Sequence, residues 1–228
     1  MTYKDLVLSE NNTYFLYQNK NIFDRFFINA LKFHDEGLAA VQDEMGWFHI
    51  NLEGKDLYKN RYKRTFGYYF GASTVIDFND NAFHLDIKGT KIYAQNYAWC
   101  GNFQQKICVV KNFENQYFHI DLKGNKIYPE NYLYAGDFYD NYACVMLKEN
   151  KLFKHIDLNG KDLNGHLFQD LGVFHKGFAT AKDAKGWFHI DKKGNEIYKE
   201  RYLQIEPFYN GCALVTTFEN EKKIINDF

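Results

Sequence analysis

The sequence lacks a surplus of charge of either sign and lacks long apolar runs. Among its 228 residues, 28 Lys and Arg stand against 29 Asp and Glu, which gives a net charge of −1, and no basic run is present. This balance argues against capture of nucleic acid or of an anionic membrane as the main function. No stretch approaches the roughly 18 uncharged apolar residues of a membrane-spanning helix, and charges interrupt the N-terminal stretch too early for a signal peptide. We expect a cytoplasmic protein without nucleic-acid or membrane partners.

Cysteine is scarce, and the common motifs of enzymes are absent. The four cysteines include Cys100, and their spacings match no zinc pattern. The other three, Cys108, Cys144 and Cys212, stand in apolar runs, which predicts buried free thiols. The sequence has no glycine-rich phosphate loop, no Gly-x-Ser-x-Gly, no His-Glu-x-x-His and no nucleotide fingerprint. It indicates no catalytic residue, no metal and no cofactor, and it favours a protein that is not an enzyme.

Aromatic residues are abundant, at 19%, and they recur with a fixed period. The tripeptide Phe-His-Ile occupies 48–50, 118–120 and 188–190, and variants of it occupy 83–85 and 154–156. The central histidines are separated by 35, 35, 36 and 34 residues, and they are His49, His84, His119, His155 and His189. Five of the eight histidines therefore follow one period, which predicts a tandem repeat.

Each repeat contains the pattern of a strand and a turn. In "WFHID" (187–191), Phe188 and Ile190 are expected on one face of a strand, and Trp187 and His189 on the other. An Asp or Asn follows each histidine by two residues and a Gly by five, a spacing typical of a turn in which Gly is left-handed. An aromatic residue follows later in each repeat, at Tyr69, Phe103, Phe138, Phe174 and Phe208.

These patterns predict an all-β protein of tandem β-hairpin repeats of about 35 residues, stacked into an open solenoid-like array. A closed β-propeller is the alternative architecture, although about 35 residues is short for a four-stranded blade. We expect a single repeat domain over 1–228, with a partial hairpin at 5–17, about six repeats, and a closing hairpin at 212–228. The more polar first and last hairpins would cap the array, and the protein is expected to be a monomer.

The repeats resemble those of the WG (tryptophan–glycine) repeat family of bacterial proteins. "EGLAAV" (36–41) and "FHKGFATA" (174–181) are similar to the first strand of that repeat, and Trp47 and Trp187 to its tryptophan. Pro129 matches the proline in the tail of the family repeat, whereas Phe-His replaces Gly-Tyr in the second strand throughout. The resemblance implies an interaction or scaffold module, and it supplies no catalytic residues.

The histidine column is the sharpest candidate for a site. Stacked in register, His49, His84, His119, His155 and His189 would form a row that could bind an anionic or sugar-like ligand, respond to pH, or hold metals. The alternative is a structural ladder in which each ring packs on its neighbour or hydrogen-bonds a turn, and this alternative is favoured. Two columns of tyrosines follow the histidines, and they are expected in the core rather than as stacking platforms: Tyr58, Tyr93, Tyr128 and Tyr198; Tyr62, Tyr97, Tyr132 and Tyr202.

The repeat at 153–186 departs most from the others, because it loses both column tyrosines and gains His166 and His175. A departure from internal symmetry is where a site is most expected, although sequence drift looks the same. We therefore predict a non-catalytic binding or scaffold module that presents an extended face, rich in aromatic residues and histidine, to a protein, polymeric or small-molecule partner. The alternative is an enzyme with a pocket around 153–186 and His166 or His175 as general base.

Overall fold

The computed structural model describes residues 2–226, and over these residues the protein is all-β apart from one short 3₁₀ turn, η1 (Tyr3–Asp5). Residues 1, 227 and 228, which the predicted domain and closing hairpin include, lie outside the described residues. The chain forms two compact units. The first comprises residues 1–115 and 120–125, and the second residues 116–119 and 126–228. The predicted all-β class and tandem repeats are confirmed.

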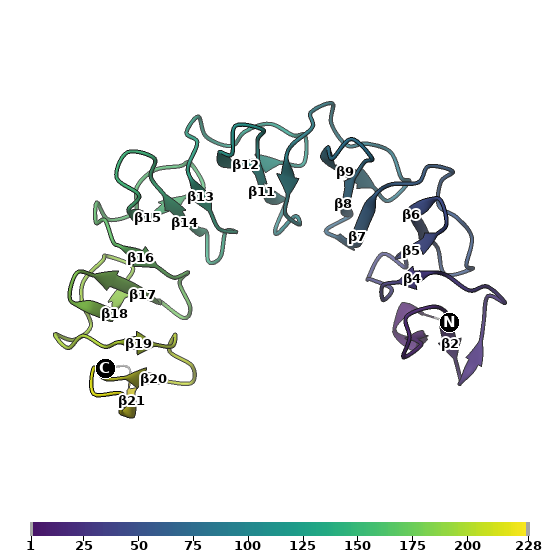
Figure 1. Ribbon diagram of the computed structural model, residues 1–228. Helices are drawn as coiled ribbons and strands as arrows, with labels where there is room; N and C mark the ends of the chain where they lie inside the picture. The colour runs from purple at the N-terminus through teal and green to yellow at the C-terminus, as the bar shows by residue number, and fades with distance from the viewer. Residues whose placement is uncertain (1, 227–228) are drawn as a thin grey trace. The chain divides into compact units, whose positions relative to one another are not determined.

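The first unit contains three complete antiparallel sheets, each of three strands consecutive in the chain (Figure 1). Their strands are β1 (Val7–Leu8), β2 (Phe15–Tyr17) and β3 (Lys20–Asn21); β4 (Asn29–Ala30), β5 (Ala39–Asp43) and β6 (Gly46–Ile50); β7 (Arg64–Tyr69), β8 (Ala72–Ile76) and β9 (Ala82–Asp86). A further antiparallel pair follows, formed by β10 (Trp99–Cys100) and β11 (Ile107–Lys111). This simple order fits the predicted hairpin repeat.

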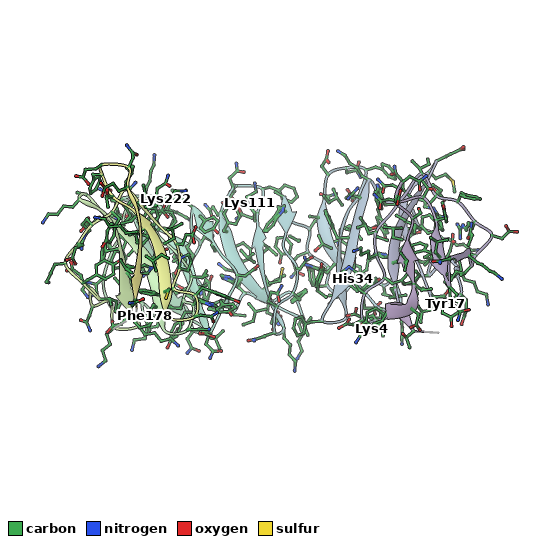
Figure 2. All side chains as sticks on the ribbon, turned by 90° about the horizontal axis from the view of Figure 1, so that it is seen from below. Lys4, Tyr17, His34, Lys111, Phe178 and Lys222 are labelled. Carbon is green, nitrogen blue, oxygen red and sulfur yellow. The ribbon has the colours of Figure 1, made fainter. Side chains whose placement is uncertain are left out.

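The second unit repeats the same plan three times (Figure 1). Its sheets consist of β13 (Tyr134–Ala135), β14 (Tyr142–Met146) and β15 (Phe153–Asp157); β16 (Asp170–Leu171), β17 (Phe178–Asp183) and β18 (Gly186–Asp191); β19 (Gln204–Ile205), β20 (Cys212–Thr216) and β21 (Lys222–Asn226). The remaining strand, β12 (Tyr117–Asp121), is divided between the two units. Phe178, which begins β17, and Lys222, which begins β21, lie on opposite edges of these sheets (Figure 2).

Both faces of the inner sheets are buried, which corrects the expected division into a core face and a separate histidine face. In β18, His189 is as fully buried as Phe188 and Ile190 on the opposite face. The cause is stacking of successive sheets, because each inner sheet is covered on both sides. Cys144 of β14, for example, packs in one cluster with Ala179 of the next sheet. Aromatic and aliphatic residues dominate these layers, as they do in other stacked repeats.

The predicted Asp-x-x-Gly turns are confirmed. Asp121 accepts hydrogen bonds at Oδ1 from the backbone N–H groups of Lys123 and Asn125, both at 2.8 Å. The turn glycine is left-handed in each repeat, and its φ is +78° at Gly124. A β-carbon at Gly124 would stand 2.6 Å from the ring of Tyr93 in the preceding repeat. The glycine is therefore required both by the turn and by the packing of the repeats.

One position of the predicted pattern is shifted by a residue. Tyr68, not Tyr69, packs against His49, with 4.7 Å between the ring centroids, whereas Tyr69 is partly exposed. The pairing of β7 with β8 changes register between Thr65 and Tyr68, which indicates a β-bulge. Such a bulge places one extra residue in the strand and moves the aromatic position along the chain.

No helix among residues 2–226 is long and apolar enough to cross a membrane.

Candidate functional site

The five column histidines lie inside the stacked sheets, and none is more than 1% exposed. The Nε2 atom of each lies 2.8 to 3.0 Å from a backbone carbonyl oxygen 17 residues further along the chain. Those carbonyls belong to Phe66, Gly101, Gly136, Gly172 and Glu206. Because a carbonyl can only accept, Nε2 carries the proton and donates it. Each histidine therefore connects its own strand to the following repeat.

The second ring nitrogen is occupied in four of these repeats. The hydroxyl of a tyrosine nine residues further along donates to Nδ1, at 2.5 Å between His49 and Tyr58 and 2.6 Å between His189 and Tyr198. The same bond joins His84 to Tyr93 and His119 to Tyr128. Neutral imidazole is the form that satisfies both bonds. Burial lowers the pKa of His49, His84, His119 and His155 to about 4, and also lowers the pKa of His189.

The column therefore forms a series of hydrogen-bonded links between repeats, and the rings do not stack on one another as a ladder would. Each imidazole packs instead on an aromatic ring of the next repeat, as His155 does on Phe174 at 4.2 Å between ring centroids. Both column tyrosines also lie in the interior, and the hydroxyls of the first column point inward to histidine rather than to an edge. Binding of a ligand by the five column histidines stays a prediction, and their burial and hydrogen bonds do not favour it.

The variant repeat lacks the tyrosine that the link requires. Asn164 stands nine residues after His155, and both His155 Nδ1 and Asn164 Nδ2 are buried without a hydrogen-bond partner. The side chains of Asn164 and His166 lie against Gly194, where a tyrosine ring covers the corresponding glycine in other repeats. His166 is exposed and packs beside Phe168, with 6.3 Å between the ring centroids. Its position is thus explained by the missing tyrosine.

His175 lies in a different place, beside a tight turn at one edge of the sheet. Lys176 and Gly177 both have positive φ, +50° and +94°, and the backbones of His175 and Phe178 exchange two hydrogen bonds across them. This is the geometry of a two-residue type I′ hairpin turn, which matches the twist of paired strands. The same arrangement occurs at the corresponding turns of the neighbouring sheets, where it holds Tyr139 and Tyr209. Three successive turns of the second unit therefore present a ring at one repeat position.

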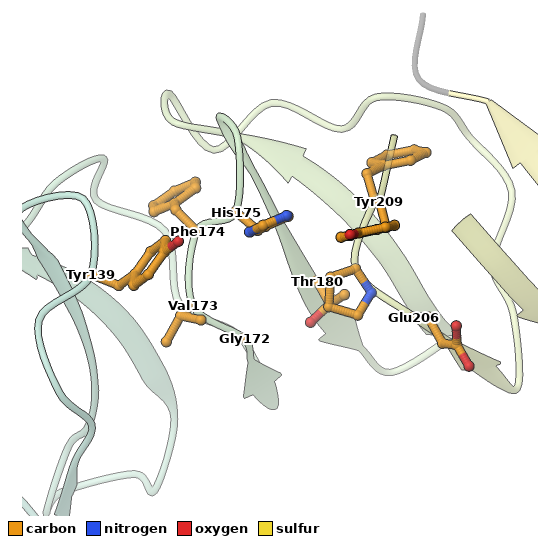
Figure 3. A pocket seen from close by; sticks show the side chains of 10 residues that line it. Tyr139, Gly172, Val173, Phe174, His175, Thr180, Glu206 and Tyr209 are labelled. Atoms are coloured by element: carbon orange, nitrogen blue, oxygen red, sulfur yellow. The ribbon is translucent and has the colours of Figure 1, made fainter. Parts of the chain in front are cut away.

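These three rings follow one another along an aromatic pocket of about 640 Å³ (Figure 3). The ring centroids of Tyr139 and His175 are 6.5 Å apart, and those of His175 and Tyr209 are 6.3 Å apart and nearly parallel, at 11°. Tyr139 and Tyr209 are half or more exposed, at 50% and 69%. The remaining lining residues are Gly172, Val173, Phe174, Thr180, Glu206, Pro207 and Phe208. We name this site the turn pocket.

The first unit has a smaller hollow at the same repeat position. His34 and Tyr69 pack edge to face, with 4.8 Å between their centroids, in a hollow of about 370 Å³ that Glu36 and Phe70 also line. Its smaller volume and its closed ring pair leave less room for a bound group than the turn pocket offers.

The structure does not place His166 and His175 in one site, because His166 does not line the turn pocket. His175 Nε2 is buried without a hydrogen-bond partner, so no carboxylate orients it as a general base. Within residues 2–226, no group of three or more His, Cys, Asp or Glu side chains is arranged to hold a metal ion. The arrangement can enclose an apolar or flat group between rings, and it offers one carboxylate, Glu206, for polar recognition.

Tyr139 and Tyr209 were not among the residues predicted for a site. A signal for them exists in the sequence, because each directly follows a column aromatic, Phe138 or Phe208, as His175 follows Phe174. The step from a buried ring to an exposed ring recurs with the period of the repeat. It could have been recognised only with the turn geometry in hand, since a two-residue turn decides that the second ring faces solvent.

Comparison with protein families identifies two of the repeats. Residues 119–151 and 187–217 match the model of the WG containing repeat, so the predicted resemblance to the WG repeat family is confirmed. No curated protein matches the sequence.

Several solved structures are similar in fold. The computationally designed Ika8 protein matches with a TM-score of 0.51 and 11% identity, over 97% of this chain and 80% of the designed chain. BamB from Moraxella catarrhalis matches with a TM-score of 0.50 and 10% identity, over 94% of this chain and 74% of BamB. The WD40 beta propeller domain of Doa1 matches with a TM-score of only 0.39 and 10% identity, over 96% of this chain and 87% of that one. Identities this low concern the fold and not the function.

Proposed function

We propose that this chain is a non-catalytic binding module that holds a segment of a partner protein in the turn pocket. The observation that carries the proposal is the row of Tyr139, His175 and Tyr209 along one cavity. A volume of about 640 Å³ falls within the range of roughly 300 to 1,000 Å³ that is usual for ligand sites. Tyrosine is also enriched at protein interfaces, because a ring supplies a large contact area with little conformational entropy to lose.

The spacing of the rings supports a peptide in extended conformation. Side chains on one face of a strand are separated by two residues, or about 6.4 to 6.8 Å. The centroid distances of 6.5 and 6.3 Å along the turn pocket match this repeat. Successive side chains of the partner segment would therefore each meet the same part of a successive ring.

The test is selection of peptides against the protein, followed by measurement of their dissociation constants on variants. We expect Tyr139→Ala combined with Tyr209→Ala to weaken a selected peptide at least about tenfold, since central interface rings each contribute more than about 1 kcal/mol. Both rings are well exposed, so the melting temperature should stay unchanged. Tyr69→Ala, at the same repeat position in the first unit, is the matched control. Undiminished affinity of the double variant would refute the proposal.

We further propose an open array of stacked repeats, working as a monomer. Within each unit, strands of different sheets meet in successive sheets, as β5 and β6 meet β7 and as β18 meets β19. Ile224 stands at the histidine position of the last sheet and is 73% exposed, which is expected where no further sheet covers it. Small-angle scattering tests this: a compact chain of this length would have a radius of gyration of about 17 Å, and an open array a larger one. A value near 17 Å, or the mass of a dimer, would contradict the proposal.

We also propose that the protein works in the cytoplasm. All four cysteines are free, and Cys100, Cys108 and Cys144 are buried. Cys212 was predicted to be buried but is exposed, because it belongs to the last sheet, which no further repeat covers. Free thiols of this kind persist in a reducing compartment. Fractionation of the producing cells, with recovery of the protein outside the cytoplasmic fraction, would refute this placement.

A further inference from the structure

We propose that the turn pocket selects a cationic group, namely the side chain of an arginine or lysine in the bound peptide. This inference deepens the proposed function and rests on it. Two independent features of the pocket carry it: the number of aromatic faces, and a carboxylate that the other repeats do not have.

The aromatic faces are the first feature. Five of the ten lining residues carry rings, and these are Tyr139, Phe174, His175, Phe208 and Tyr209. The face of an aromatic ring is electronegative and attracts an ammonium or guanidinium group within about 6 Å of its centroid. This chain already uses that interaction at the same ring, because Lys176 Nζ lies 5.5 Å from the centroid of Tyr209. Arginine stacks still more closely in the core, where the Arg201 guanidinium carbon is 3.7 Å from the centroid of Phe188.

The carboxylate of Glu206 is the second feature. Its backbone carbonyl accepts the hydrogen bond of His189, and at the equivalent position the preceding repeats have Gly172, Gly136 and Gly101. The glutamate is thus a departure from the repeat, placed where its side chain lines the turn pocket on the side of Tyr209 (Figure 3). Among the described residues, no lysine or arginine forms an ion pair with it. A negative charge beside electronegative ring faces favours a positive ligand.

The remaining lining residues argue against the other ligand classes. No lysine, arginine, asparagine or glutamine lines the turn pocket, so an anion would meet Glu206 without a compensating charge. A sugar would require a spread of donors and acceptors around the rings. The hydroxyl of Thr180 is the main neutral polar group apart from the tyrosines, and Thr180 is only 9% exposed. An apolar stem that ends in a positive charge fits this lining better, and arginine and lysine side chains have that form.

The experiment compares the peptide acetyl-Ala-Arg-Ala-amide with the same peptide carrying citrulline, which has the shape of arginine without its charge. Binding is followed by ¹H–¹⁵N spectra of the full chain. We expect the arginine peptide to shift the backbone signals around the three turns, and to bind at least about fivefold more tightly than the citrulline peptide. Glu206→Gln should reduce that preference about fivefold, whereas Tyr69→Ala should leave it unchanged. Glu206→Gly, which restores the residue of the other repeats, is a second variant that keeps the fold.

A further arm separates the two sources of a cation. Tetramethylammonium is titrated beside its neutral analogue 3,3-dimethylbutanol, and binding of tetramethylammonium without binding of the arginine peptide would overturn the assignment to a protein segment. Equal binding of the arginine and citrulline peptides would refute cation selection and leave the binding module standing. If neither these peptides nor any selected peptide bound at the turns, the proposed function would fail as well.

Discussion

At the scale of single residues, a tyrosine hydroxyl fixes the position and protonation state of a buried histidine in four repeats. The hydroxyl donates to Nδ1, which leaves Nε2 to donate to the carbonyl of the next repeat. A buried polar atom that loses its partner costs the full penalty of its desolvation. The variant repeat already carries this cost at His155 Nδ1.

Two opposite substitutions test the link. Tyr93→Phe removes the hydroxyl that bonds His84, and we expect it to lower the free energy of unfolding by about 1 to 3 kcal/mol. Asn164→Tyr supplies the hydroxyl that His155 lacks, and we expect it to raise the free energy by about 1 kcal/mol. Urea unfolding of both variants beside the unaltered protein measures the changes. If Asn164→Tyr destabilised the protein as much as Tyr93→Phe, the link would not be the stabilising interaction.

The buried histidines also predict how stability depends on pH. Burial lowers the pKa of four of them from the ordinary 6.5 to about 4 in the folded state. As pH falls below 6.5, the unfolded chain therefore binds protons that the folded chain does not. We expect the free energy of unfolding to be level above about pH 6.5 and to fall steadily between pH 6.5 and about 4. Urea unfolding at pH 7 and pH 5 checks this, and equal values at the two pH values would contradict neutral, buried imidazoles.

How far the sequence predicted these residues depends on the range of each contact. The period of 35 residues revealed the histidine and tyrosine columns and placed both correctly in register. The partner of Nε2 could not be predicted, because a backbone carbonyl 17 residues away leaves no trace in side-chain identity. Exposure of Cys212 was missed for a related reason: its apolar neighbours Ala213 and Leu214 suggest a core, but no sheet follows to cover it.

At the scale of elements, the turns combine a backbone requirement with a packing requirement. Gly124 has a φ of +78° and lies against the Tyr93 ring, whereas Gly165 has a similar φ of +74° and no atom within 4 Å of the point that a β-carbon would occupy. The Asp-x-x-Gly pattern predicted the first requirement. The second could not be predicted, because it arises only when one repeat stacks on another.

This pair of glycines gives a matched test. Gly165→Ala should cost only the strain of a left-handed alanine, about 1 to 2 kcal/mol. Gly124→Ala should cost more, by at least about 1 kcal/mol, because its β-carbon would stand 2.6 Å from the Tyr93 ring. Thermal unfolding of the two variants measures the difference. Equal losses would mean that the glycine serves the turn alone and not the packing between repeats.

At the scale of the molecule, repetition explains the fold and departures from repetition explain the candidate site. The stacked sheets follow from a pattern that recurs along the chain, so they could be predicted from sequence. The turn pocket combines residues from three turns, Tyr139, His175 and Tyr209, with a glutamate found only in the last. Sequence symmetry pointed to the variant repeat and thereby to His175. It could not indicate which neighbours would share a cavity with that residue, because a cavity depends on the shape left between side chains.

Hydrogen exchange of the backbone amides, with and without a peptide selected for binding, tests the central claim most directly. The account predicts that bound peptide slows exchange at the turns of the second unit, around residues 139–142, 175–178 and 209–212, and leaves exchange at the turn around residues 69–72 unchanged. Slower exchange confined to other parts of the chain, with no change at the three turns, would contradict the assignment of the turn pocket as the binding site.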